Sequence, residues 1–215
     1  MTIMLKTTRT KISQCHFFVS TQCNLRCSGC YTGSGNALKN ELTPEEIRTT
    51  ARTHKRMFDS VHLEGGEPLL PSVFERTKAF AEGIGNLGNT TLSTNGTILY
   101  DRRFNVLLKH KLGILQFSID GATQETHGRN RSGSSLKDIL KNMGAFRKAG
   151  FFIQMRTTLR LNNLFECENM VNTAVAHRLP AIKLVLIAPA GRAAHLGDEA
   201  IGVSRLQTLA DQIKN

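Results

Sequence analysis

The chain alternates short apolar segments with longer amphipathic segments, and this alternation restricts its fold more than any other feature. Six apolar segments have the length and side-chain content of strands, and helical spacing follows each of them. The predicted strands span residues 15–20, 60–64, 90–93, 114–119, 151–159 and 181–187. Such repeated βα units predict an α/β fold in which helices surround a parallel sheet.

Two of the predicted helices have clear boundary signals. Thr43 and Glu46 form a capping box around Pro44, so one helix starts at this proline. Its apolar face is formed by Ile47, Ala51, His54 and Phe58. A second helix ends before Gly150 and carries, at helical spacing, Leu136, Ile139, Leu140, Met143 and Phe146. Further helices are predicted near residues 72–84, 102–111, 164–178 and 203–214.

The composition is that of a globular protein, with 40% hydrophobic and 21% charged residues. No segment approaches the roughly 18 consecutive apolar residues of a membrane-spanning helix. The basic segment at residues 1–13 lacks the continuous apolar stretch of a secretory signal. We therefore expect a cytoplasmic protein with no membrane partner and one main domain over residues 14–215.

The net charge of +11 raises the question of a nucleic-acid partner, because clustered Lys and Arg neutralise phosphates. The basic residues are spread over residues 6–11, 48–56, 102–111 and 129–131, with few aromatic residues between them. This scatter favours a solvated basic surface over a site for a polyanion. Nucleic acid is therefore the less favoured partner.

Three of the five cysteines lie in one loop after the first strand, in the pattern Cys23-x-x-x-Cys27-x-x-Cys30. In the reducing cytosol, such close spacing favours metal ligands or redox-active thiols over disulfides. Three thiolates can hold a cubane iron–sulfur cluster by three irons, which leaves the fourth iron open to a small molecule. A zinc site with His16 or another residue as fourth ligand, or unligated thiols, are the alternatives.

Polar and glycine residues follow the next three strands, at the edge where parallel α/β barrels gather their chemistry. After the second strand, Gly65 and Gly66 let backbone groups approach a ligand closely, and Glu67 stands beside them. The groups at the next two strand ends are Asn95, Ser118 and Asp120. They suit an amino-acid or ribose group, although Asn-Gly and Asp-Gly are also common turn formers.

Arg156 lies in an otherwise apolar and Thr-rich fifth strand. An unpaired buried guanidinium is costly, so we expect an anionic partner for it. That partner is either a ligand or a carboxylate on a neighbouring strand.

The motif CNLRCSGCY at residues 23–31, followed in order by GGEP, STNG and SIDG at strand ends, resembles the radical S-adenosylmethionine (radical SAM) superfamily. The resemblance extends over roughly residues 14–214. It implies a partial (β/α)6 TIM-like barrel with parallel strands, which agrees with the six βα units. It also implies an enzyme whose cofactors are a 4Fe–4S cluster and S-adenosylmethionine.

The resemblance also implies roles for individual residues. Cys23, Cys27 and Cys30 would bind the cluster, whose open iron would chelate the amino and carboxylate groups of S-adenosylmethionine. Tyr31 and the backbone near Ile187 would lie by the adenine. The residues expected to face the methionine amino group are Gly65, Gly66 and Glu67. Those expected at its carboxylate are Ser118 and Arg156, and the weaker cofactor-binding candidates are Asn95 and Asp120.

The implied reaction is reductive cleavage of S-adenosylmethionine to a 5′-deoxyadenosyl radical, which abstracts hydrogen from a peptide or cofactor-precursor substrate. An electron donor such as flavodoxin or ferredoxin is implied as partner. The phrases CNLRCSGCY, SIDGATQETHGRNR and PAGRA are most similar to enzymes that mature peptides, peptide-derived cofactors or haems. That branch commonly has a cysteine-rich carboxyl-terminal extension, and Cys15 and Cys167 cannot form a second site of this kind. We therefore expect either a single-cluster enzyme or a core without its extension.

Two other functions remain as alternatives. One is an RNA-modifying radical SAM enzyme, which the positive net charge favours. The other is a non-enzymatic iron–sulfur electron carrier or a zinc-binding interaction protein. A carrier normally has four protein ligands to its cluster and needs no glycine-lined cosubstrate site, so this class is the least favoured.

Overall fold

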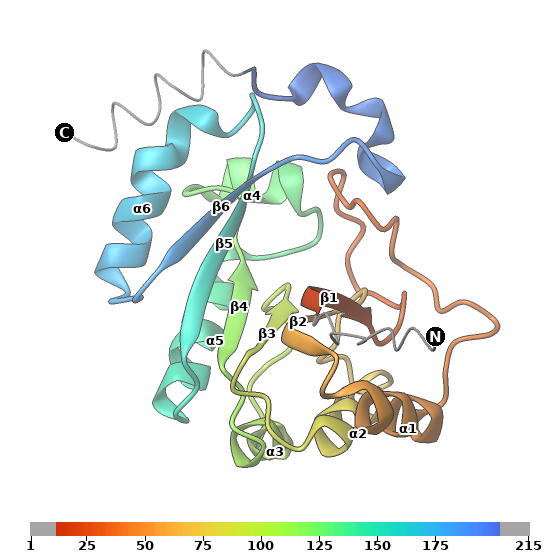
Figure 1. The fold of residues 1–215 in the computed structure, drawn as a ribbon. Coiled ribbons are helices and arrows are strands. Elements are labelled where there is room, and N and C mark those ends of the chain that lie inside the picture. The colour runs from red at the N-terminus through yellow and green to blue at the C-terminus, as the bar shows by residue number, and fades with distance from the viewer. Residues whose placement is uncertain (1–11, 203–215) are drawn as a thin grey trace, which may run out of the picture.

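The computed structural model describes residues 12–202, and within them six parallel strands form one curled sheet (Figure 1). The strands are β1 (Ile12–Phe18), β2 (Phe58–Glu64), β3 (Thr90–Thr94), β4 (Ile114–Ser118), β5 (Ile153–Leu159) and β6 (Ile182–Leu186). Each strand pairs with its sequence neighbour, from β1 at one edge to β6 at the other. The predicted partial barrel is therefore confirmed. Of the basic segment expected at 1–13, residues 1–11 lie outside the described residues. The helix expected at 203–214 lies outside them as well.

Helices flank this sheet, most of them on its convex side, and α4 lies beyond the carboxyl end of β4 (Figure 1). They are α1 (Pro44–His54), α2 (Phe74–Ile84), α3 (Asn105–Lys109), α4 (Gln124–Asn130), α5 (Leu136–Lys148) and α6 (Cys167–Ala176). Short 3-10 turns are η1 (Arg102–Phe104), η2 (Leu164–Glu166), η3 (Gly191–His195) and η4 (Gly197–Glu199). All helices predicted within the described residues are present, and α4 is an additional one. None of the helices between residues 12 and 202 has the length and apolar character that a membrane crossing requires.

The start of α1 follows its capping box, and its end corrects the sequence prediction. The Thr43 side chain accepts from the Glu46 amide, and the Glu46 carboxylate accepts from the Thr43 amide at 2.8 Å. The helix ends at His54, and Phe58 opens β2 instead of extending the helical face. Phe58 pairs with Ile12, so β1 starts at residue 12 and ends at residue 18, not at the predicted 15 and 20. The ladder between β1 and β2 therefore overrides the local helical spacing.

Alternation along the strands gives the sheet two different faces. The core under the helices includes the fully buried strand residues Leu63, Leu92, Leu115, Phe117 and Met155. The residues between them point to the concave face and are mostly polar, including His62, Glu64, Gln116, Ser118 and Arg156. The fold therefore combines an apolar core with a polar inner surface.

Candidate functional site

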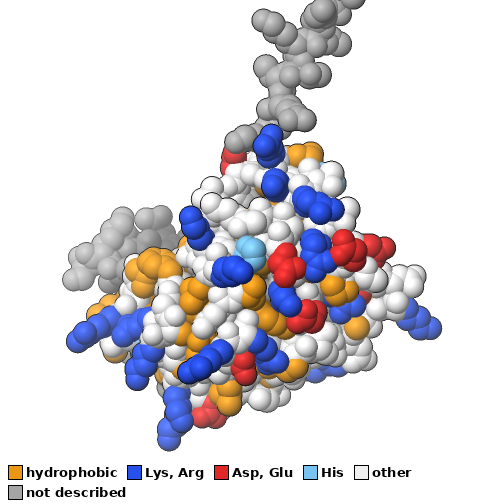
Figure 2. All heavy atoms as spheres, turned by 90° about the horizontal axis from the view of Figure 1, so that it is seen from below, with side chains coloured by type: hydrophobic (Ala, Val, Ile, Leu, Met, Phe, Trp, Pro, Cys, Tyr) orange, Lys and Arg blue, Asp and Glu red, His pale blue; other side chains and the backbone are white. Residues whose placement is uncertain are grey.

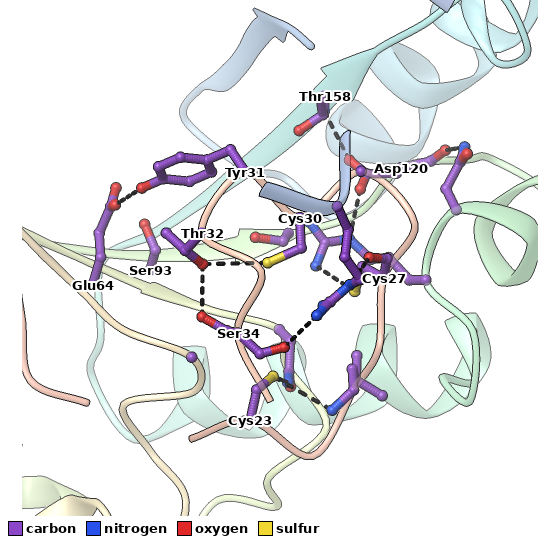
Figure 3. A pocket seen from close by; sticks show the side chains of 18 of the residues that line it. Cys23, Cys27, Cys30, Tyr31, Thr32, Ser34, Glu64, Ser93, Asp120 and Thr158 are labelled. Atoms are coloured by element: carbon purple, nitrogen blue, oxygen red, sulfur yellow. Dashed lines mark hydrogen bonds and ion pairs between the residues drawn. The ribbon is translucent and has the colours of Figure 1, made fainter. Parts of the chain in front are cut away.

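One pocket gathers residues from the loop after β1 and from the carboxyl ends of the strands (Figure 3). It encloses about 810 Å³ of space, which includes open solvent at its mouth. The predicted site residues that line it are Cys23, Cys27, Cys30, Tyr31, Gly65, Gly66, Asn95, Ser118, Asp120 and Arg156. Glu67 and Ile187 are not among the lining residues.

Arg192 in η3 holds the backbone of the cysteine loop. Its Nε donates to the Cys27 carbonyl and its backbone amide to the Cys30 carbonyl, both at 2.9 Å. Its Nη1 donates to the carbonyls of Gly33 at 2.8 Å and Ser34 at 2.6 Å. One residue after β6 therefore fixes four carbonyls of the loop after β1.

Arg160 is a second anchor of the loop, and the sequence analysis missed it. Its guanidinium is buried and donates to the side chains of Ser28 and Asn130 at 3.0 and 2.9 Å. It also pairs with Glu199 at 3.2 Å. A Cβ on Gly29 would lie 2.1 Å from Arg160 Nη2, so glycine is needed for this close approach.

The three thiols have different electrostatic surroundings. Burial raises the pKa values of Cys23 and Cys27. Burial acts the same way on Cys30, but hydrogen bonds from Thr32 and the Ser34 backbone outweigh it and lower the pKa of this thiol. All three cysteines are free. The site therefore offers three thiols, and the pKa of Cys30 is shifted in the opposite direction from the pKa values of Cys23 and Cys27.

Polar groups also approach the cysteine sulfurs. The side-chain amide of Asn95 donates to Cys23 Sγ at 3.8 Å, and Arg131 Nη1 lies 4.0 Å from Cys27 Sγ. Arg131 is held by Asp120, whose Oδ2 accepts from its Nε at 2.7 Å. The other Asp120 oxygen accepts from the Thr158 amide at 2.7 Å. Asp120 therefore aims a positive charge at the cysteine loop.

The two glycines after β2 lie against the exit of β1. The Gly66 amide donates to the Ser20 carbonyl at 2.8 Å. A Cβ on Gly66 would lie 2.1 Å from the Gln22 carbonyl oxygen, and one on Gly65 would lie 2.9 Å from that of Ser20. Their missing side chains thus allow the two backbone segments to meet at the wall of the pocket.

Glu67 is fully buried and is not a lining residue of the pocket. Its carboxylate accepts from the backbone amide of Asn95 at 2.6 Å, from the Thr94 hydroxyl at 2.8 Å and from the backbone amide of Leu69 at 3.0 Å. Burial nevertheless raises its pKa to about 7. The side chain joins the loop after β2 to the end of β3.

Arg156 lines the pocket, and its buried Nε has no hydrogen-bond partner within residues 12–202. No described carboxylate forms the ion pair that was one of the two expectations for this residue. Ser118 pairs with Arg156 in the sheet and lines the same wall. Tyr31 also lines the pocket and donates its hydroxyl to Glu64 (Figure 3). Ile187 is buried behind the wall, where its amide donates to a β5 carbonyl at 3.2 Å.

The donor set fits a cluster better than a single zinc ion. His16, the suggested fourth zinc ligand, lies in β1 beside His62 and Glu64. Among the described His, Cys, Asp and Glu side chains, only these three bring donor atoms within 4.8 Å of one another. The three cysteines form no such group, as suits thiolates bound to separate irons. The buried Nε of Arg156, which has no hydrogen-bond partner among the described residues, supplies a donor for an anionic ligand in the same pocket.

Comparisons of sequence extend over most of the chain. A sequence model described as the radical SAM superfamily matches residues 17–174. The AdoMet-dependent heme synthase of Methanosarcina barkeri is 32% identical over 193 residues, which cover 85% of this chain and 51% of the relative. The GTP 3′,8-cyclase of Mycolicibacterium smegmatis is 31% identical over 137 residues, or 61% of this chain and 38% of the relative. The chain thus spans about half the length of the first of these curated relatives.

Solved structures share the fold at low identity. SuiB of Streptococcus suis, bound to the precursor peptide SuiA, has a TM-score of 0.80 at 15% identity. The match covers 95% of this chain and 46% of SuiB. The structure of anSMEcpe with bound AdoMet has a TM-score of 0.63 at 16% identity and covers 82% of this chain and 52% of that one. At such identities the likeness concerns the half-barrel itself.

Proposed function

This chain belongs to the radical SAM superfamily, and from this premise we propose that its pocket binds a 4Fe–4S cluster and S-adenosylmethionine for radical modification of a peptide or cofactor precursor. Enzymes of this family use both cofactors. When bound, the pair supplies an electron and a cleavable carbon–sulfur bond, and hence a 5′-deoxyadenosyl radical that abstracts hydrogen from a substrate. Cys23, Cys27 and Cys30 hold the cluster in this proposal.

The observation that carries the proposal is the combination, in one pocket, of three free thiols and an Arg156 Nε that has no hydrogen-bond partner among the described residues. Arg156 and Ser118 offer donors for the carboxylate of the cosubstrate, and the backbone of Gly65 and Gly66 lets its amino group come close. Tyr31 offers a ring for the adenine and is held by its hydrogen bond to Glu64. Asn95 acts on cofactor binding through its side-chain amide near Cys23 Sγ. Asp120 acts through Arg131, which it holds near Cys27 Sγ.

The protein around the thiols tunes the cluster in two ways. Hydrogen bonds and positive charge near sulfur stabilise the reduced form of an iron–sulfur centre and raise its potential. Here these groups are the Asn95 amide and the Arg131 guanidinium. An external electron donor such as flavodoxin or ferredoxin, in the cytoplasm, would supply the electron.

A peptide or cofactor precursor is the favoured substrate class, since one relative is named as a heme synthase and one structural neighbour is bound to a precursor peptide. RNA is the second candidate because the net charge is +11. Figure 2 shows one face of the molecule on which Lys and Arg are interspersed with hydrophobic and acidic side chains. On this face, the basic side chains do not form the continuous patch that an RNA-binding surface needs.

Anaerobic reconstitution tests the proposal directly. The chain should take up about four irons and, with dithionite and S-adenosylmethionine, release 5′-deoxyadenosine. Cys27→Ala should lose both the iron and the product. Cys15→Ala, which removes a cysteine outside the pocket, is the matched control and should keep them. Uptake of a zinc ion that is lost in Cys27→Ala, without any 5′-deoxyadenosine, would refute the enzyme.

A further inference from the structure

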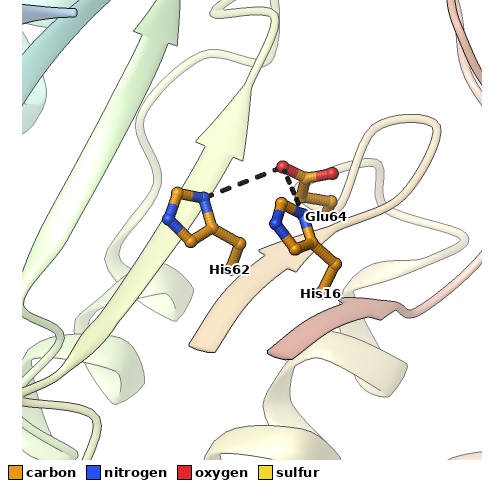
Figure 4. A group of neighbouring side chains, drawn as sticks. All are labelled: His16, His62 and Glu64. Carbon is orange, nitrogen blue, oxygen red and sulfur yellow. Dashed lines mark ion pairs between the residues drawn. The ribbon is translucent and has the colours of Figure 1, made fainter. Parts of the chain in front are cut away.

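Two histidines and a glutamate meet on the concave face of β1 and β2, outside the cysteine motif (Figure 4). His16 lies opposite His62 in the parallel ladder, and Glu64 follows His62 by two residues. All three side chains therefore point to the same face of the sheet. The two imidazole rings are stacked, with 4.9 Å between their centroids.

The donor atoms of these residues have the spacing of metal ligands. His16 Nδ1 and His62 Nδ1 lie 3.5 and 3.8 Å from the same Glu64 oxygen, Oε1. All three donor atoms lie within 4.8 Å of one another. Ligands about 2.1 Å from a tetrahedral ion are about 3.4 Å apart, so small side-chain movements would bring the donors to bonding distance.

The carboxylate is positioned as a buried ligand. The Glu64 and His62 side chains are only 7% and 11% exposed, so their donors stay in place without much loss of entropy on binding. Tyr31 donates to Glu64 Oε2 and thereby leaves Oε1 facing the imidazoles. Such a hydrogen bond to a ligating carboxylate orients it and strengthens metal binding.

We propose that His16, His62 and Glu64 bind one first-row divalent transition metal ion of the zinc or ferrous class. Two imidazoles and one carboxylate are the donor set of sites that keep coordination positions open. The His16 side chain is 47% exposed, so its ring is free to turn its lone pair toward a shared ion. Glu64 also lines the cysteine pocket, so the proposed ion would lie beside that pocket.

The surrounding charge selects among cations. Lys183 and Arg156 repel positive charge at His62, while Glu64 attracts it. Only an ion with a strong preference for imidazole nitrogen overcomes this repulsion, which excludes the oxygen-seeking Mg²⁺ and Ca²⁺. The site does not depend on the proposed function, because none of its ligands is a cysteine.

Cobalt titration of the anaerobically reconstituted protein tests the site. One Co²⁺ per chain should bind beyond the cluster iron and give ligand-field bands without thiolate-to-cobalt charge transfer. His62→Ala should weaken this binding at least about tenfold, and Tyr31→Phe roughly 10- to 100-fold. Lys183→Ala should tighten it. His177→Ala, at the end of α6, is the matched control and should bind like the unchanged protein.

A second arm removes the competing thiolates. The variant with Cys23, Cys27 and Cys30 all changed to Ser, checked for folding by circular dichroism, should bind the same single Co²⁺ with the same bands. Excess Mg²⁺ should not displace it. Equal Co²⁺ uptake by the His62→Ala and His177→Ala proteins would overturn the site, as would thiolate bands in the reconstituted protein.

Discussion

At the scale of single residues, we expect Arg156 to lower the stability of the protein without ligand and to strengthen ligand binding. Its buried Nε has no partner among the described residues, which costs about 1 kcal/mol or more in the protein without ligand. We expect Arg156→Met to weaken binding of S-adenosylmethionine roughly 10- to 100-fold, because a charge-assisted hydrogen bond is lost. The same change should raise the free energy of unfolding of the apoprotein.

Equilibrium binding and urea unfolding measure these two effects of Arg156→Met. The control is Arg129→Met, because Arg129 is exposed and its pair with Glu125 contributes little. Reduced affinity together with reduced stability would mean that Arg156 has a structural partner.

His127 makes the stability depend on pH. Burial, with help from the nearby Arg131 charge, lowers the pKa of His127 from 6.5 to about 4. Between these values the unfolded chain binds more protons than the folded one, so stability is lost as pH falls from 6.5 to 4. The loss from this group is about 3 kcal/mol.

The matched variant for this effect is His127→Asn, which offers an acceptor for the Asp120 amide in place of Nδ1 but does not titrate. Urea unfolding at a series of pH values should give a flatter profile for the variant over this window. An unchanged profile would place the titration elsewhere.

Some residues of the site were predictable from the sequence because they follow strands, and parallel strands end at one edge of the sheet. The three cysteines, Gly65, Gly66 and Arg156 were found in this way. The hydrogen-bond partners of Glu67 were not predictable, because they lie at the end of β3 and are distant in sequence. Arg160 was missed because it belongs to no motif and Ser28 lies 132 residues away in sequence.

At the scale of elements, α4 depends on a single glutamate. Glu166 accepts hydrogen bonds from the Ala122 amide at 2.6 Å and from the hydroxyls of Thr123 and Thr126 at 2.8 and 2.7 Å. We expect Glu166→Ala to lower the free energy of unfolding by about 3 kcal/mol, because these buried donors lose their partner. Urea denaturation measures this. Glu168→Ala, an exposed change in α6, should have little effect, and equal effects would contradict this anchoring role.

The same contact explains why α4 was not predicted. The helix has seven residues, QETHGRN, with no apolar side chain among them. Local spacing therefore offered no helical signal beyond Thr123 as a capping residue. What fixes the element is Glu166, more than forty positions away in the chain. The long helices α1 and α5 were predictable because caps and apolar spacing agreed within each segment.

At the scale of the whole molecule, Arg192 joins η3, after the last strand, to the cysteine loop after the first strand. We expect Arg192→Lys to keep the charge but lose the multiple hydrogen bonds of the planar guanidinium to the loop carbonyls. The reconstituted variant should then lose its iron roughly tenfold faster to a chelator, which corresponds to about 1.4 kcal/mol in the barrier.

Decay of the visible absorbance of the cluster measures this rate. Arg52→Lys, on the exposed side of α1, is the matched control and should not change it. Equal decay in both variants would show that the cysteine loop holds the cluster without Arg192.

The number and order of strands followed from the alternation of apolar and helical segments, because each βα unit packs beside the previous one. The packing of η3 on the loop after β1 could not be predicted in the same way. It depends on the guanidinium of Arg192 and on Gly191, whose Cβ would lie 2.4 Å from the Tyr31 carbonyl oxygen. Such long-range fits leave no periodic trace in a sequence.

The position of Arg192 also has a consequence for biosynthesis. It follows Cys27 by 165 residues, so a ribosome completes the cysteine motif long before it makes the residue that holds the loop. A nascent chain therefore presents its thiols on an unanchored segment until Arg192 has been made. Iron delivered early would meet an open loop, which Arg192 can hold only after β6 has emerged.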